Sequence, residues 1–301
     1  MPEQVQPRHI ERVHVVVNPA SGQAEPVLHP LNAVFNEHDI AWDVSITHRA
    51  GDAEQFARQA AQSGADLVAA YGGDGTVLEV ASGLHGTDVP LAILPGGTAN
   101  LLSVELGIPN TLADAAALIT HPGAIMRPVD MGRAGDHLFF HLGLGIEGEM
   151  IHKTDRKAKN SSGVLAYVLA ALQSLRDHPP VQYRLTLDGD TVEVEGINCM
   201  ITNYGSLGVG GFSLSHQIDM SDGLLDVLVI GAADLGQFIA AAASAIARGD
   251  LTRSLQQWQA REVRVEANAP QTVTRDGEVL ELDAITAQVV PGAVHILVPG
   301  E

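Results

Sequence analysis

The feature that most constrains this chain is the glycine-rich segment Gly72-Gly73-Asp74-Gly75-Thr76. It follows the apolar run Asp66–Tyr71, which predicts a short buried strand, and it precedes Val77–Leu84, whose apolar residues have helical spacing. Glycines allow close approach of a ligand, and the free N–H groups of such a turn and helix start bind anions, most often phosphate. The Asp74 carboxylate would repel a phosphate unless a cation lay between them. The motif therefore predicts a nucleoside triphosphate with Mg²⁺; taken alone, it could equally be a plain turn.

Residues 11–129 alternate strand and helix patterns, which predicts a parallel sheet covered on both faces. The expected strands are Val13–Val17, Ala41–Thr47, Asp66–Tyr71 and Leu91–Leu94, and the expected helices are Val27–Glu37, Asp52–Gly64 with Asp52 as N-cap, Val77–Gly83 and Leu112–Ile119. Ligands of such sheets bind beyond the carboxyl ends of the strands. Four segments lie at such ends, namely Asn18–Gly22, Thr47, Gly72–Thr76 and Gly96–Asn100, and we therefore expect them to form one site.

From residue 130 onward the pattern changes to many short strands separated by turns such as Asp188-Gly189-Asp190 and Asp276-Gly277. This texture predicts a mostly antiparallel sandwich or curled sheet. Two helices are expected within it, at 162–176 and 234–248. We therefore expect two domains, a nucleotide-binding α/β domain at 1–129 and a β-sandwich domain at 130–301.

Composition excludes several classes of protein. The net charge of −19 argues against nucleic-acid binding, which needs a basic face. A single cysteine, Cys199, excludes an internal disulfide framework, and the N-terminus has no secretory leader, so we expect a cytoplasmic protein. The apolar stretches Ser161–Leu175 and Leu235–Ala247 are shorter than the ~20 residues that span a bilayer. No Gly-x-x-x-x-Gly-Lys-Ser/Thr motif occurs, which excludes a P-loop kinase.

One short segment is basic in this acidic chain. It contains Lys153, Arg156, Lys157 and Lys159, which include all three lysines, and it directly precedes the apolar helix expected at Gly163–Leu175. A solvated loop would explain this segment equally well. The other interpretation is reversible docking on an anionic membrane surface, to which each cation contributes about 1 kcal/mol.

Five motifs together resemble the diacylglycerol kinase catalytic-domain family, which includes bacterial lipid kinases and the sphingosine and ceramide kinases. They occur in the family's order and span nearly the whole chain: Asn18-Pro19-Ala20-Ser21-Gly22, Gly72–Thr76, Pro95-Gly96-Gly97-Thr98-Ala99-Asn100, Asp222-Gly223-Leu224-Leu225-Asp226-Val227 and Asp276-Gly277-Glu278. The resemblance implies a Rossmann-like, phosphofructokinase-type N-terminal domain and a β-sandwich C-terminal domain, with the active site in the cleft between them. It also implies transfer of the γ-phosphoryl group of ATP to a lipid hydroxyl, at a peripheral position on the membrane.

The resemblance assigns roles to single residues. Glu278 resembles the proton acceptor, with Asp276 beside it, and Asp74 resembles the carboxylate that orients the catalytic Mg²⁺. A second, structural Mg²⁺ site is implied at Asp222 with main-chain oxygens of Asp219 and Leu224. The expected nucleotide-binding residues are Asn18, Thr47, Gly72, Gly73, Gly75, Thr76, Gly97, Thr98 and Asn100.

Two other functions stay open at this point. An NAD kinase shares the Gly-Gly-Asp-Gly-Thr turn, and Leu78 fits that family slightly better, although Asn18–Gly22 and Pro95–Asn100 do not occur there in this form. A non-catalytic nucleotide- or lipid-binding regulator would be expected to lose acidic positions, yet Asp74, Asp222, Asp276 and Glu278 are all present. The sequence names neither the acceptor lipid nor the oligomeric state, and it leaves a homodimer open.

Overall fold

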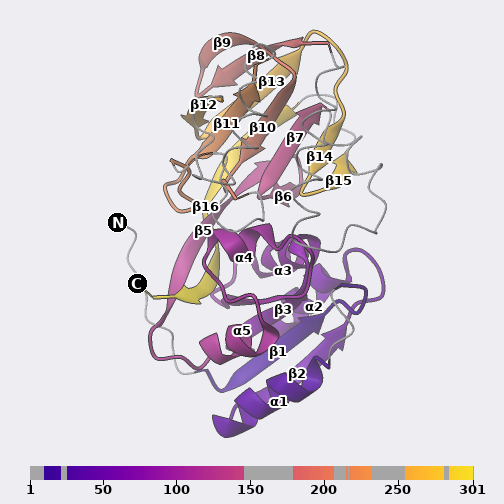
Figure 1. The fold of residues 1–301 in the computed structure, drawn as a ribbon, viewed down its shortest axis with the longest axis vertical. Helices are drawn as coiled ribbons and strands as arrows, with labels where there is room; N and C mark the ends of the chain where they lie inside the picture. The colour runs from indigo at the N-terminus through magenta and orange to yellow at the C-terminus, as the bar shows by residue number, and fades with distance from the viewer. Residues whose placement is uncertain are drawn as a thin grey trace, which may run out of the picture. The chain divides into compact units, whose positions relative to one another are not determined.

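The computed structural model describes residues 10–21, 26–145, 179–206, 215, 217–231, 255–280 and 285–300. The chain divides into two compact units, shown in Figure 1: unit 1 comprises Met1–Asp130 and Pro291–Glu301, and unit 2 comprises Met131–Val290. The helices expected at 162–176 and 234–248, the basic segment at 153–159 and Gly22 lie outside the described residues.

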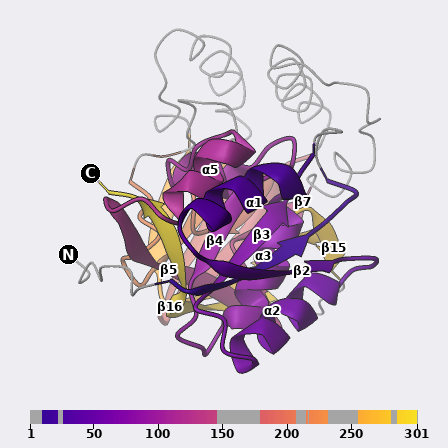
Figure 2. The same ribbon diagram turned by 90° about the horizontal axis from the view of Figure 1, so that it is seen from below.

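Unit 1 is a parallel sheet with helices on both faces, which confirms the predicted α/β architecture. Its strands, in the spatial order β2-β1-β3-β4, are β1 (Arg12–Val17), β2 (Ala41–Ile46), β3 (Leu67–Gly72) and β4 (Leu91–Pro95). Its helices are α1 (Leu28–Glu37), α2 (Asp52–Gln62), α3 (Asp74–Leu84), α4 (Leu101–Glu105) and α5 (Leu112–Leu118). Figure 2 shows α1 and α5 on one face of the sheet and α2 on the other, and α2 packs against α3.

The burial of each strand follows from its place in the sheet. Every residue of β3 and β4 is buried, because both strands have neighbours on two sides and helices on two faces. β2 has only β1 as a partner and is largely exposed, so its sequence is more polar. The C-terminal end of β16 (Ile285–Pro299) extends the sheet beside β4, where Ile296 is the partner of Leu91.

Unit 2 is built from antiparallel strands, as predicted. One sheet has the order β12-β11-β10-β7-β14-β15, and the strands β16, β13, β8 and β9 follow one another in the other, with β6 paired to β5. The strands are β5 (Ala124–Ala134), β6 (His137–Phe139), β7 (His141–Gly145), β8 (Val181–Leu187), β9 (Asp190–Gly196), β10 (Asn198–Thr202), β11 (Leu225–Ile230), β12 (Gln256–Ala260), β13 (Glu262–Ala267), β14 (Val273–Arg275) and β15 (Glu278–Leu280). The chain passes from one unit to the other within β5 and again within β16.

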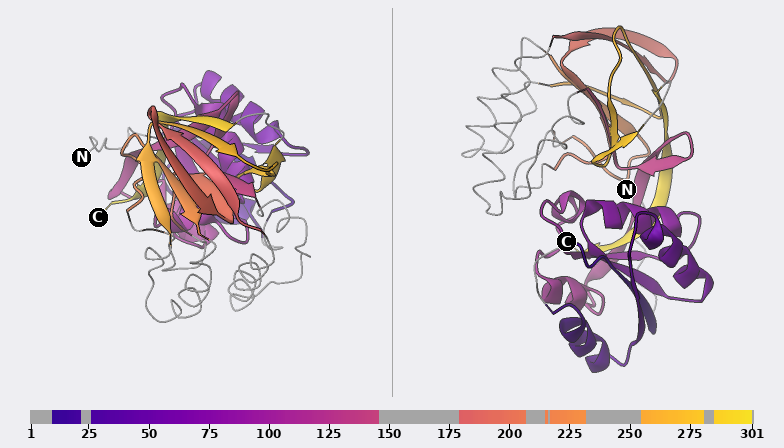
Figure 3. Two further views of the ribbon diagram at one scale, coloured as in Figure 1. Left: turned by 90° about the horizontal axis from the view of Figure 1, so that it is seen from above. Right: turned by 90° about the vertical axis from the view of Figure 1, so that its right-hand side faces the viewer.

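An apolar core joins the two sheets of unit 2. It takes Leu142, Ile201 and Val227 from the first sheet and Leu185 and Val263 from the second, all fully buried. Figure 3 shows these strands as two layers, and the side chains of the two inner faces fill the space between them, as in other sandwiches.

Local details of unit 1 differ from the sequence-based expectation. The helix expected to begin at Val77 begins at Asp74, and the short α4 was not expected. The prediction that Asp52 caps α2 is wrong: the N-cap is Gly51, and the Asp52 carboxylate instead accepts N–H groups of the preceding loop. Of the helices that the structure describes, none has the length and hydropathy needed to cross a bilayer.

Candidate active site

Two glycine-rich turns lie in backbone contact at the carboxyl ends of β3 and β4. The N–H of Gly96 donates to the carbonyl oxygen of Gly72 at 2.9 Å. A Cβ atom placed on Gly97 would lie only 2.6 Å from the Cα atom of Gly73, so these positions touch without side chains. The structure therefore brings the segments Gly72–Thr76 and Gly96–Asn100 together, although 19 residues lie between them in the chain.

The glycines of the first turn fall into two groups. Gly72 is required by packing, because a Cβ there would lie 2.5 Å from Cβ and Oγ1 of Thr76. Gly73 has a φ of −89°, which any residue can adopt, and a Cβ there would make an ordinary contact of 3.5 Å with Gly97. A Cβ on Gly75 would meet no atom within 4 Å. Packing does not explain glycine at 73 and 75, whereas close approach of a ligand to the backbone would.

Substitution of Gly73 should separate folding from ligand binding. We expect Gly73→Ala to keep the thermal midpoint within a few degrees of wild type and to weaken ATP-induced stabilisation, and Gly73→Val to abolish it, because each added methyl group occupies ligand space. Thermal unfolding with and without MgATP measures both quantities. A Gly73→Val protein with full ATP-induced stabilisation would show that the turn does not contact a nucleotide.

The loop after β1 borders the first turn, and the loop after β2 begins beside the end of β1. The Asn18 side-chain amide donates to Thr76 Oγ1 at 3.0 Å, and its carbonyl oxygen accepts the N–H of Ala20. The buried Thr47 donates its N–H to the carbonyl oxygen of Val17 at the end of β1. Asn18 thus connects the loop after β1 to the start of α3. Thr47 lies at the end of β2, the edge strand next to β1.

Asn100 shapes the second turn from within. Its backbone is left-handed, with a φ of 48°. Its side-chain oxygen accepts the N–H of Gly97 at 2.9 Å, and its amide donates to the carbonyl oxygen of the same residue at 3.1 Å. These contacts make Asn100 the residue that closes the turn, while Thr98 is exposed at its tip and is accessible to a ligand.

The Asp74 carboxylate is at the first residue of α3 and faces the start of α4. Its Oδ1 atom accepts the N–H of Leu102 at 3.3 Å. Burial raises the pKa of Asp74 from its ordinary value, and N–H groups at the start of α4 partly oppose this shift. A desolvated carboxylate beside an anion-binding turn is suited to a divalent cation, because the cation would stabilise the charged form that burial disfavours.

In unit 2, Asp276 and Glu278 occupy one tight turn but have different surroundings. The two Asp276 oxygens accept the N–H groups of Phe140 and His141, each at 3.1 Å, and its φ of 44° is left-handed. The Glu278 carboxylate is 64% exposed and lies 3.3 Å from a guanidinium nitrogen of Arg275. Asp276 therefore fixes the turn against β7, and Glu278 presents its carboxylate to the outside.

The turn before β11 contains the residues expected to hold a second metal ion. Asp222 Oδ1 accepts the N–H of Leu224 at 2.9 Å, and Asp219 Oδ1 accepts the N–H of Ser221 at 3.0 Å. Burial, and secondly the charge of Asp219, raise the pKa of Asp222, while hydrogen bonds oppose the shift. A cation would relieve both effects, so these residues fit the expected ion. The described residues contain no cluster of three or more His, Cys, Asp or Glu side chains arranged for a metal, but the expected set uses main-chain oxygens.

Sequence reasoning gave no role to Asp226, the second residue of β11. The residue is fully buried in an otherwise apolar strand, and its Oδ1 atom accepts from the Gln257 amide at 2.7 Å. Within the described structure its Oδ2 atom has no hydrogen-bond partner. Burial raises the pKa of Asp226 to about 6, with the hydrogen bond from Gln257 opposing the shift. The signal in the sequence was a lone aspartate within Leu225–Ile230.

Asp226→Asn should stabilise the protein in a pH-dependent way. Between pH 4 and 6 the folded protein retains a proton that the unfolded chain releases, so wild-type stability falls as pH rises through this window. The variant should gain about 1–3 kcal/mol above pH 6 and little near pH 4. Denaturant unfolding at pH 4, 5, 6 and 8 in EDTA measures this, and an equal gain at every pH would contradict the titration.

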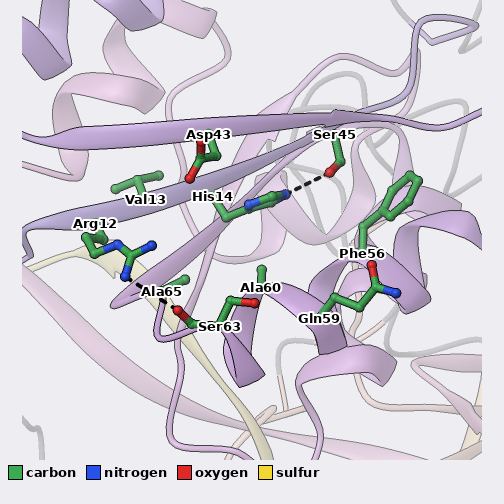
Figure 4. Close-up of a pocket in the computed structure, with 10 residues that line it drawn as sticks. All are labelled: Arg12, Val13, His14, Asp43, Ser45, Phe56, Gln59, Ala60, Ser63 and Ala65. Atoms are coloured by element: carbon green, nitrogen blue, oxygen red, sulfur yellow. Dashed lines mark hydrogen bonds between the residues drawn. The ribbon is translucent and has the colours of Figure 1, made fainter.

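A separate cavity of about 240 Å³ lies between α2 and the first strands of unit 1 (Figure 4). It is lined by Arg12, Val13, His14, Asp43, Ser45, Phe56, Gln59, Ala60, Ser63 and Ala65. Nε2 of His14 lies 2.9 Å from Ser45 Oγ, and burial lowers the pKa of His14, partly opposed by the Asp43 charge. Arg12 and His14 stand at the beginning of β1, whereas Asn18 follows its end, so the cavity does not belong to the glycine-rich turns.

Comparison with known proteins identifies both units. The "Diacylglycerol kinase catalytic domain" matches residues 12–134, and the "YegS C-terminal NAD kinase beta sandwich-like domain" matches residues 142–298. A diacylglycerol kinase of Bacillus subtilis is 30% identical, and the alignment covers 97% of this chain and 98% of that protein. A Pseudomonas putida protein named "Probable lipid kinase YegS-like" is 31% identical over 89% of this chain and 90% of its own.

The fold agrees with this relationship. A crystal structure of a diacylglycerol kinase from Bacillus anthracis superposes with a TM-score of 0.76 at 26% identity, covering 97% of this chain and 98% of that one. The matches to both halves of the chain, the order of the motifs and the fold thus indicate the same family. The chain belongs to the diacylglycerol kinase catalytic-domain family of lipid kinases.

Proposed function

We propose that this protein transfers the γ-phosphoryl group of ATP to the hydroxyl group of a neutral, diacylglycerol-like lipid. The observation that carries the proposal is the contact between two glycine turns at the carboxyl ends of β3 and β4, with the Asp74 carboxylate at the start of α3. The names of the relatives from Bacillus subtilis and Pseudomonas putida support a lipid acceptor.

The nucleotide end of the reaction uses the turns of unit 1. The backbone N–H groups near Gly73 and Gly75 would bind the phosphates, and Thr47 and Thr98 would add contacts at the neighbouring strand ends. The Asp74 carboxylate would hold Mg²⁺, which supplies charge neutralisation for the transferred group. The second ion would stabilise the turn Asp219–Leu224 and takes no part in the chemistry.

The acceptor end uses the turn of unit 2. Glu278 would accept the proton of the lipid hydroxyl as the hydroxyl oxygen bonds to the γ-phosphorus, and the bond from this phosphorus to the bridging oxygen of ADP breaks. Asp276 would act as a positioning residue, because its carboxylate oxygens accept the backbone N–H groups of Phe140 and His141. An exposed carboxylate fits the role of a base that meets a substrate from outside.

The membrane contact stays a prediction. The lipid is expected to bind unit 2, and docking is expected at Lys153, Arg156, Lys157 and Lys159, which lie outside the described residues. The cytoplasmic, peripheral location is likewise an expectation from the sequence.

A radiometric assay with separate acceptors tests the proposal. The purified full chain is incubated with labelled MgATP and, in parallel, with diacylglycerol in mixed micelles, with NAD, or with no acceptor. Label in the lipid fraction alone supports the lipid kinase. Label in NADP would assign the NAD kinase activity instead, and ATP binding without transfer to either would favour a non-catalytic regulator.

A further inference from the structure

The segment between β2 and α2 is held by a residue from another helix. Gly51, the N-cap of α2, has no side chain that could satisfy the first N–H groups of the helix. Glu79 of α3 does so instead: its Oε1 atom accepts the N–H of Gly51 at 2.9 Å, and its Oε2 atom accepts the N–H of Ala53 at 3.1 Å. A carboxylate at a helix N-terminus also interacts favourably with the helix dipole.

α3 and α2 are in backbone contact beside this cap. A Cβ atom on Gly83 would lie 2.3 Å from the carbonyl oxygen of Glu54, so a side chain at that position would separate the helices. Glu79 stands one turn before Gly83 and one turn after Thr76 on the same helix. The first turn of α2 is therefore fixed relative to the helix that begins in the glycine-rich turn.

A second carboxylate secures the loop that leads into α2. Asp52 Oδ2 accepts the N–H groups of His48 and Arg49 at 2.9 and 3.1 Å. The His48 hydrogen bond is the largest cause of the lowered pKa of Asp52, so the carboxylate is charged in this role. Thr47, at the start of this loop, is tied by its own N–H to Val17. The loop 47–53 is thus connected to β1 at one end and to α3 at the other.

We propose that Glu79 is a positioning residue that holds the loop 47–53 in a fixed position relative to the glycine-rich turn. This inference rests on the proposed function, because it assigns the loop, through Thr47, to the nucleotide. A loop that is ordered before the nucleotide arrives does not have to be ordered on binding, which favours affinity. Glu79 should therefore act on the binding of ATP and leave the transfer step unchanged.

The test compares Glu79→Ala with wild type in the full chain. The KM for ATP should rise about tenfold, as expected for the loss of hydrogen bonds to a charged group. The kcat and the KM for lipid should stay within about twofold, because the loss affects ground state and transition state equally. Hydrogen exchange of the peptide 47–53 in the nucleotide-free protein should become faster. Glu79→Gln retains one accepting oxygen and should give intermediate values in both measurements.

Glu54→Ala is the matched control. Glu54 is a glutamate in the first turn of α2, which is the turn that Glu79 of α3 contacts. The Glu54 side chain is exposed and pairs with Arg58 on the surface. The Glu54→Ala variant should have a KM for ATP and a hydrogen-exchange rate of the peptide 47–53 close to those of the wild type.

Three outcomes would overturn the inference. A higher KM with unchanged exchange would mean that Glu79 contacts the nucleotide itself. Faster exchange with an unchanged KM for ATP would show that Glu79 holds the loop but that the loop does not contribute to ATP binding. Unchanged KM and unchanged exchange would show that Glu79 neither holds the loop nor affects ATP binding. If wild-type protein shows no ATP-dependent transfer, the proposed function fails, and the exchange comparison still decides whether Glu79 holds the loop.

Discussion

Asp74→Asn is expected to lower kcat by roughly 10²–10³-fold or more, the scale for loss of a charge-stabilising group at a reacting centre. Asparagine retains an oxygen that can accept the N–H of Leu102, so the loop geometry is preserved. It removes the charge that would hold Mg²⁺. Because burial raises the pKa of Asp74, the charge is a cost in the free protein, and the variant should be as stable as wild type or slightly more so. Turnover and thermal unfolding without nucleotide measure the two effects.

The control for this variant is Asp43→Asn. Asp43 is an exposed aspartate on β2 of the same unit, away from the glycine-rich turns. Its replacement should leave turnover within about twofold, as for other exposed substitutions. Near-wild-type turnover of Asp74→Asn would reject the kinase assignment, and a large loss of stability would show that the carboxylate serves the fold.

Glu278→Gln is expected to lower kcat by about 10²–10⁴-fold, the usual contribution of a general base. The KM for ATP should change little, because a base acts in the transition state and takes no part in nucleotide binding. Stability should also change little, since the pair with Arg275 is exposed on the glutamate side and such pairs contribute about 0–1 kcal/mol. Steady-state kinetics with ATP and lipid varied separately distinguish these parameters.

Glu193→Gln provides a matched control in unit 2, because Glu193 is also exposed and also pairs with an arginine, Arg184. It should have wild-type kinetics. If ATP affinity falls in Glu278→Gln as much as kcat does, Glu278 is a nucleotide or metal ligand, and the proton acceptor has to be sought elsewhere.

The order of strands and helices around the glycine-rich turn was largely visible in the sequence. The apolar run before Gly72 and the helical spacing after Thr76 predicted a strand, a turn and a helix, and β3 and α3 have this order. Alternation of such units predicted the parallel sheet, and frequent turns after residue 130 predicted the antiparallel strands. These features follow from local periodicity and turn residues, which neighbouring positions in the sequence determine.

What sequence reasoning missed depends on partners far away in the chain. Asp52 was expected to cap α2, but the side chain that accepts N–H groups at the start of this helix is Glu79, 28 positions later than the N-cap residue Gly51. The resemblance placed Asp276 beside the expected proton acceptor Glu278 without giving it a separate task. The structure shows that the Asp276 carboxylate holds the turn through the N–H groups of Phe140 and His141, whereas the Glu278 carboxylate is exposed.

The sequence by itself determined the type of most elements of unit 1, the order of the motifs and the likeness to lipid kinases, because these depend on residue identity and spacing. Tertiary structure alone decided that Gly73 and Gly97 touch and that Ile296 near the C-terminus pairs with Leu91. The physical reason is that apolar periodicity specifies which face of a strand or helix is buried but does not specify its partner. Partner choice depends on how all the elements pack together, and packing is a property of the whole chain.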